Sequence, residues 1–212
     1  EKNNKECFIF FTFLLVLTIV LPIWEKGHWV KWVGQNRTDA WDFFFIYFTK
    51  LGEEIVYAII LLFLLFRKYA YAAIVPLVGT LVGVLSWFLK DWFNQPRPLQ
   101  YYKDLDALYN LNLIENFKTM TGYSSFPSGH TFSAFAIYTF LALTTKSKWI
   151  NILSIILAIG VGISRVYLNQ HFLEDIYFGS VLGVSLGIAM FYLAEFIAKK
   201  FPVMNKSYSK KV

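Results

Sequence analysis

Cysteine and histidine are scarce in this chain of 212 residues, which has one cysteine, Cys7, and three histidines. A single cysteine excludes an intrachain disulfide, and so few sulfur and imidazole groups exclude a metal cluster of Cys and His ligands. Charged residues are also few, at 16% of the chain, whereas 57% is hydrophobic. A soluble domain of this length cannot bury that much apolar surface, so the composition indicates an integral membrane protein.

The net charge of +6 does not indicate a nucleic-acid partner. The basic residues are scattered between apolar runs and form no basic block. Anionic lipid surfaces are therefore the expected partner of this charge.

Six apolar runs predict an all-α membrane bundle of six transmembrane helices, folded as one domain over 1–212. The first run resembles a signal peptide, but no small-residue cleavage site follows it, so we expect a retained span. The predicted spans are 8–23, 43–66, 70–89, 131–145, 150–167 and 176–198.

Two connections predict helices that lie in the membrane interface. The segment 24–42 mixes tryptophans with charged residues, and the long connection 99–126 carries leucines between Leu105 and Ile114. Within the spans, Lys50 and Glu54 have the spacing of an ion pair. Glycines spaced for close helix contact recur in two spans, at Gly79 and Gly83 and at Gly179, Gly183 and Gly187.

Six spans place both ends of the chain on one side of the membrane. That side carries eleven of the twenty Lys and Arg residues, and the other side carries nine, three of them in the candidate motifs below. This bias favours cytoplasmic termini.

A polar segment, 164–175, joins the fifth run to the sixth. Arg165 ends the apolar run, His171 follows six residues later, and Asp175 lies four residues beyond. If 171–175 is helical, His171 and Asp175 share one face and can touch. The carboxylate then holds one ring nitrogen and leaves the other to accept a proton or attack an electrophile, while arginine offers paired donors to a phosphate. The alternative is an interfacial cation beside a histidine that a neighbouring acid satisfies.

Two further polar segments fall on the same side in this topology. They are 90–98, Lys-Asp-Trp-Phe-Asn-Gln-Pro-Arg-Pro, and 127–130, Pro-Ser-Gly-His. Taken alone, the two cations can snorkel to the interface and the histidine can simply begin a helix. The topology nevertheless gathers six reactive or charged residues at one interface, namely Lys90, Arg97, His130, Arg165, His171 and Asp175.

The three segments resemble the tripartite signature of the type 2 phosphatidic acid phosphatase (PAP2) superfamily. They match it in order and at full spacing as Lys90-x6-Arg97-Pro98, Pro127-Ser128-Gly129-His130 and Ser164-Arg165-x5-His171-x3-Asp175. The resemblance covers roughly spans two to six, the arrangement of the family's membrane members, whereas 24–42 and 99–126 match nothing assignable.

The resemblance implies a phosphatase that needs neither metal nor cofactor and works through a phosphohistidine. His171 is then the nucleophile, Asp175 fixes its tautomer, and His130 protonates the leaving oxygen and later activates water. The implied phosphate-binding residues are Lys90, Arg97, Ser128, Gly129 and Arg165. The implied substrates are undecaprenyl pyrophosphate, phosphatidylglycerol phosphate, phosphatidic acid or a lipid A phosphate. We expect the site on the periplasmic or extracellular face of the cytoplasmic (inner) membrane.

Two other functions are alternatives to a lipid phosphatase. Vanadium-dependent haloperoxidases resemble the family in the same motifs, but they are soluble, which six apolar spans oppose. A non-catalytic protein that binds or transports lipid phosphates needs the cations but not two histidines and an aspartate. The sequence leaves the oligomeric state and the preferred lipid open.

Overall fold

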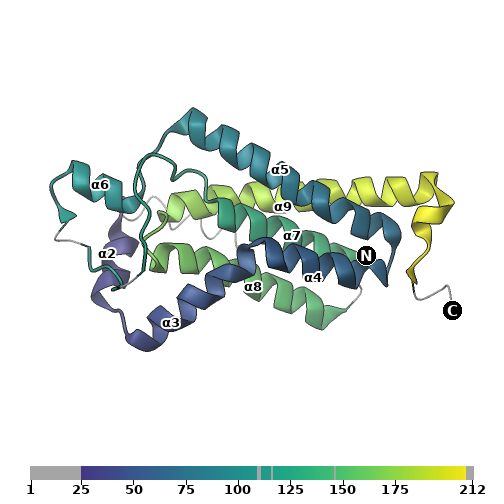
Figure 1. Cartoon of the computed structure of the whole chain (residues 1–212), viewed down its shortest axis with the longest axis horizontal. Coiled ribbons are helices and arrows are strands. Elements are labelled where there is room, and N and C mark those ends of the chain that lie inside the picture. Colours follow the sequence, from purple (N-terminus) through teal and green to yellow (C-terminus); the bar gives the residue numbers. More distant parts are fainter. Residues whose placement is uncertain (1–24, 109–110, 116, 146, 209–212) are drawn as a thin grey trace.

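Helices build the fold in this computed structural model, which describes residues 25–108, 111–115, 117–145 and 147–208 and has no strand among them (Figure 1). The expected first span, 8–23, lies outside the described residues. In chain order the elements are α2 (His28–Gln35), α3 (Asp39–Phe48), the 3-10 helix η2 (Thr49–Gly52), α4 (Glu54–Leu65), α5 (Tyr69–Phe93), α6 (Pro98–Asp104), α7 (Gly129–Thr144), α8 (Lys148–Tyr167), α9 (Leu173–Lys200) and η4 (Pro202–Asn205).

The outer surface of the bundle is apolar. Three helical stretches are long and apolar enough to cross a membrane, namely Tyr69–Asp104, which joins α5 to α6, then α8 and α9, while α4 is a shorter apolar helix. Their outward side chains include Ile59, Trp87 and Tyr192, which are 60%, 71% and 67% exposed. Lipid rather than water suits such a surface. The helices expected at 70–89, 150–167 and 176–198 are confirmed, and the total of six spans stays a prediction.

Helix α7, which covers the expected span 131–145, is the centre of the bundle. It lies among α5, α8 and α9 (Figure 1). Phe132, Phe135 and Phe140 are almost fully buried there and fill the core together with side chains of the surrounding helices. The helix is therefore surrounded by protein.

Close packing of α9 on α7 depends on the predicted glycine face. A Cβ at Gly179 would lie 2.8 Å from the Ser128 carbonyl oxygen, and one at Gly183 would lie 2.5 Å from the Phe135 Cβ and 2.8 Å from the Phe132 carbonyl oxygen. The same expectation for α5 is not met at Gly83 by the residues that the structure describes, none of which has an atom within 4 Å of a Cβ there. The spacing of small residues is alike in both helices, but among the described residues the α9 glycines meet a neighbouring backbone and Gly83 does not.

The expected continuous span 43–66 is wrong, because three elements replace it: α3, η2 and α4. Glu53 has extended backbone angles, φ −101° and ψ 177°, which end the helical path. Two carbonyl oxygens near the break accept hydrogen bonds from side chains of α7. The Ser133 hydroxyl donates to the Gly52 carbonyl oxygen at 2.8 Å, and the Tyr138 hydroxyl donates to the Leu51 carbonyl oxygen at 3.0 Å. Tertiary hydrogen bonds thus compensate the broken helix.

The two connections contain short helices, in part where they were expected. In 24–42 the interfacial helix is α2, and α3 already begins at Asp39. At the start of the connection 99–126 the helix is α6, which has Pro98 in its first turn, and residues 109–110 of the segment expected to be helical lie outside the described residues. Residues 111–114 are irregular.

We expect Gly183→Ala to lower the free energy of unfolding by about 1–3 kcal/mol, because the added methyl group meets backbone atoms that cannot move aside. The measurement is thermal unfolding in detergent. The matched control is Gly83→Ala, whose added methyl group meets no atom of the described residues within 4 Å and should leave the melting temperature unchanged or slightly higher. Equal stability of the two variants would contradict the close contact of α7 and α9.

Candidate active site

Five segments bring every predicted site residue to one end of the bundle. The ends of α5 and α8 and the starts of α7 and α9 lie toward the left of Figure 1, beside the turn between α5 and α6. The Ser128 amide donates to the Asp175 carbonyl oxygen at 3.0 Å, which joins the second motif to the third. A Cβ at Gly129 would lie 3.6 Å from the Lys90 Nζ, which joins the first motif to the second. The predicted convergence is therefore present.

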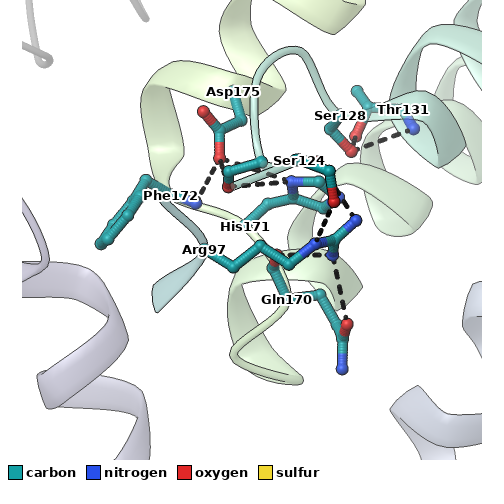
Figure 2. A network of polar contacts seen from close by, with 9 residues as sticks. Arg97, Ser124, Ser128, Thr131, Gln170, His171, Phe172 and Asp175 are labelled. Atoms are coloured by element: carbon teal, nitrogen blue, oxygen red, sulfur yellow. Dashed lines mark hydrogen bonds and ion pairs between the residues drawn. The ribbon is translucent and has the colours of Figure 1, made fainter. Parts of the chain in front are cut away.

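His171 is buried against a carboxylate at the start of α9 (Figure 2). Its Nδ1 lies 3.3 Å from the Asp175 Oδ2, which also accepts from the Phe172 amide at 2.9 Å and from the Ser125 hydroxyl at 2.5 Å. A carboxylate at Nδ1 favours the tautomer that carries its proton there. The Nε2 lone pair is then the nucleophilic one.

This pair does not form as a helical i,i+4 contact, which corrects the sequence expectation. His171 and Phe172 precede α9, which begins at Leu173. Asp175 reaches His171 because its carboxylate turns back over the helix start to the Phe172 amide, as the acidic residue of a capping box does. One hydrogen bond thus begins the helix and places the carboxylate.

A tight turn at the end of α8 presents His171. The amides of Gln170 and His171 both donate to the Arg165 carbonyl oxygen, at 3.0 and 3.2 Å. Asn169 occupies the left-handed region with φ 54°, a conformation that asparagine tolerates better than most residues. The turn fixes the position of His171 relative to Arg165.

Two buried arginines are held by protein acceptors. Arg97 donates through Nε to the Ser124 hydroxyl at 3.1 Å and through Nη1 to the Gln170 carbonyl oxygen at 3.2 Å. Arg165 donates through Nη1 to the Thr49 hydroxyl at 2.8 Å, and its Nε has no partner among the described residues. Both guanidinium groups are therefore fixed in place.

The start of α7 forms a cradle with α5. The Ser128 hydroxyl oxygen caps α7 by accepting from the Thr131 amide at 3.4 Å and from the Thr131 hydroxyl at 2.9 Å, so its own proton is left for another acceptor. Ser86 lies in the same place, with its hydroxyl 3.7 Å from a Cβ at Gly129, and it is buried without a partner in the part of the chain described. Free amides at a helix start and a nearby lysine favour an anion.

His130 has an acidic neighbour that the sequence did not predict. Its Nε2 lies 3.5 Å from Glu53 Oε1, at the break between η2 and α4. The expected ion pair of Lys50 with Glu54 is absent from the described ion pairs, and the Lys50 Nζ instead lies 5.0 Å from the centre of the Tyr47 ring. The break at Gly52 removes the helical spacing on which that expectation depended.

Sequence reasoning missed four residues that hold the site together. Ser124 and Ser125 lie shortly before the second motif and Gln170 lies inside the third, and these positions are a usable signal. Thr49 has no such signal, because it lies 116 positions from Arg165.

Positive charge and burial control the state of His171. Burial, together with Arg97, Arg165 and Lys90, lowers the pKa of His171 well below its ordinary value. The imidazole is therefore neutral at neutral pH, with a lone pair available. Among the described residues, no group of three or more His, Cys, Asp or Glu side chains is placed to hold a metal ion.

An apolar cavity of about 530 Å³ lies on the flank of the bundle between α2, α3, α8 and the start of α9. Its walls include Trp29, Trp41, Phe45, Val166 and Ile176, and the last two directly follow Arg165 and Asp175 in the chain. The cavity suits a hydrocarbon group rather than a polar one.

Comparison with known proteins places this geometry in a family. The model of the PAP2 superfamily matches residues 68–198. Phosphatidylglycerophosphatase B of Bacillus subtilis is 30% identical over 139 residues, which are 61% of this chain and 59% of that protein, so the chain spans about three-fifths of its length. The undecaprenyl-diphosphatase of Sulfolobus acidocaldarius is 30% identical over 190 residues, 82% of this chain and 86% of that one. The crystal structure of Aquifex aeolicus LpxE has a TM-score of 0.64 at 30% identity, over 77% of this chain and 92% of that chain.

We expect the His171 ring to stay neutral from about pH 8 to pH 5, through the ordinary histidine pKa near 6.5. A lowered pKa means that protonation sets in only at more acid pH. ¹⁵N NMR of histidine-labelled protein in detergent measures this, and His171→Gln identifies the signals. A titration midpoint near 6.5 for His171 would contradict the charge environment described above.

Proposed function

Because the chain belongs to the PAP2 superfamily, we propose that it is a metal-independent lipid phosphate phosphatase. The observation that carries the proposal is the meeting of three cations with a buried His–Asp pair and a second histidine at one end of an apolar bundle. Fixed positive groups stabilise a phosphoryl group, and a neutral imidazole attacks it.

The first step transfers the phosphoryl group to His171. The Nε2 lone pair forms a bond to phosphorus, and the bond to the leaving oxygen breaks with its electron pair on that oxygen. His130 gives the leaving oxygen a proton, while the positive charge that develops on His171 is stabilised by Asp175. The products are the dephosphorylated lipid and a phosphohistidine.

The second step reverses these roles with water. Neutral His130 takes a proton from a water molecule as its oxygen attacks phosphorus, and the N–P bond breaks with its electron pair returning to His171. Inorganic phosphate leaves and both histidines regain their starting states. Throughout, Lys90, Arg97 and Arg165 would balance charge on the nonbridging oxygens, joined by the Gly129 amide and the Ser128 hydroxyl.

The proposed substrate is a phosphomonoester or pyrophosphate of a lipid. The apolar cavity beside Arg165 supports this, because its volume of about 530 Å³ suits the part of a hydrocarbon chain nearest the headgroup. The relatives named for phosphatidylglycerophosphate and undecaprenyl diphosphate indicate a glycerophospholipid phosphate or an isoprenyl pyrophosphate.

His171→Ala should lower phosphate release from the best lipid substrate by roughly 10³-fold or more, because no other group replaces the nucleophile. The assay is phosphate release by detergent-purified protein from phosphatidic acid, phosphatidylglycerol phosphate, undecaprenyl pyrophosphate and a lipid A phosphate. Inorganic phosphate should still protect the variant against thermal unfolding, because the cations remain.

The matched control is His28→Ala, which alters the histidine that belongs to none of the three motifs and should keep full activity. A chelator should leave the wild-type rate unchanged. Activity that requires Mg²⁺, or that persists in His171→Ala, would contradict the proposed mechanism.

We further propose that the site faces the outside of the cytoplasmic membrane, as the distribution of basic residues predicts. Met120 is 47% exposed in the connection before α7, on the side of the site. In a Cys7→Ser background, Met120→Cys should react with an impermeant maleimide applied to intact cells. The native Cys7 should react only after lysis, and the reverse pattern would place the site in the cytoplasm.

A further inference from the structure

The break between α3 and α4 contacts both sides of the candidate site. Thr49 accepts a hydrogen bond from the Arg165 Nη1 at 2.8 Å, and Glu53 lies 3.5 Å from the His130 Nε2. Both residues precede the family match, which begins at residue 68. None of the three motifs includes this segment.

The conformation of the break is set by its neighbours. Gly52 lies so close to α7 and α8 that a Cβ would be 2.9 Å from the Val161 Cγ1 and 3.1 Å from the His130 carbonyl oxygen. Its own carbonyl oxygen accepts from the Ser133 hydroxyl at 2.8 Å. Because Gly52 is fixed one residue away, the Glu53 carboxylate is held beside His130.

Almost every other charge near His130 is positive. Lys90 of α5, Arg97, and Arg165 of α8 all interact electrostatically with it, as does His171. The Asp175 carboxylate of α9 is already bound to Ser125 and lies at His171. Glu53 is therefore the anion nearest to the second histidine among the described residues.

This arrangement bears on the proton that the leaving oxygen needs. A histidine can act as an acid in the first step only while it is protonated, and at His130 burial and three neighbouring cations disfavour that state. A carboxylate within ion-pair distance of the ring favours it.

We infer that Glu53 is a positioning residue of the acid–base step, which holds His130 in place and stabilises its imidazolium form before the leaving oxygen takes a ring proton. This inference rests on the proposed function. After that transfer the imidazole is neutral and can accept a proton from water in the second step. Thr49, in the same segment, accepts a hydrogen bond from Arg165. The break therefore positions both a phosphate-binding arginine and the histidine that would protonate the leaving oxygen.

An ordinary surface ion pair would not have this effect, since exposed pairs contribute little. The His130 and Glu53 side chains are 34% and 41% exposed, but they lie at the edge of a cationic site and not on an open surface. The next residue, Glu54, offers the matched comparison, because it is exposed at the start of α4 and has no ion pair among the described residues.

The test compares Glu53→Gln with Glu54→Gln on two substrates that differ in their need for a general acid. Phosphatidic acid releases a basic alkoxide, whereas p-nitrophenyl phosphate releases a stable phenolate. The value of kcat/KM reports the steps through transfer to His171. For Glu53→Gln it should fall roughly 10- to 100-fold on phosphatidic acid and less than about threefold on p-nitrophenyl phosphate.

Glu54→Gln should match the wild type on both substrates, and Glu53→Asp should recover part of the loss because it restores a carboxylate. Melting temperatures of all variants check the fold. Equal losses on both substrates, or no loss on either, would overturn the role of Glu53 while the wild-type activity upholds the proposed function. A wild type that releases no phosphate from any lipid would refute both. If the wild type hydrolyses phosphatidylglycerol phosphate but not phosphatidic acid, the same comparison is made with phosphatidylglycerol phosphate, which also releases an alkoxide.

Discussion

The contact of α7 with α9 is the constraint on which the site depends. In lipid, helices gain little from hydrophobic association, so close packing requires small residues that let backbones approach. Gly179 and Gly183 allow this, and the resulting register places the Ser128 amide 3.0 Å from the Asp175 carbonyl oxygen. Two helix starts are thereby joined, one carrying His130 and the other placing the carboxylate that holds His171.

Repulsion between buried positive charges is the second constraint, and it opposes the close packing of the elements that carry them. Lys90, Arg97 and Arg165 repel one another in a region where burial weakens solvent screening. The fold tolerates this because neutral acceptors hold the arginines, through Ser124 and Gln170 for Arg97 and through Thr49 for Arg165. A negatively charged phosphoryl group would relieve the repulsion between the cations. Because the cations are already in position, they would stabilise the bound group without having to rearrange.

The sequence predicted which candidate residues meet at one end of the bundle, but it did not predict most of the residues that hold them there. Spaced motifs identify residues whose chemistry is distinctive, such as His171 and Arg97, and long apolar runs identify α5, α8 and α9. The break at Gly52 was missed because the charged residues on either side of it, Lys50 and Glu54, were interpreted as an ion pair on one helix. The bonds that stabilise the break come from hydroxyl groups about 80 positions away. The position of Glu53 beside His130 could not be predicted, because no local sequence pattern encodes that contact.

The two histidines differ in exposure in a way that fits two displacements at one phosphorus atom. The His171 side chain is 2% exposed, whereas that of His130 is 34% exposed. In-line attack requires the leaving group to depart on the side opposite His171, and water must later enter on that same open side. Under the proposed mechanism, burial would protect His171 from solvent between turnovers, while the more accessible His130 would meet both the departing lipid and the incoming water. Glu53, beside His130, would then lie where a proton is transferred in each step.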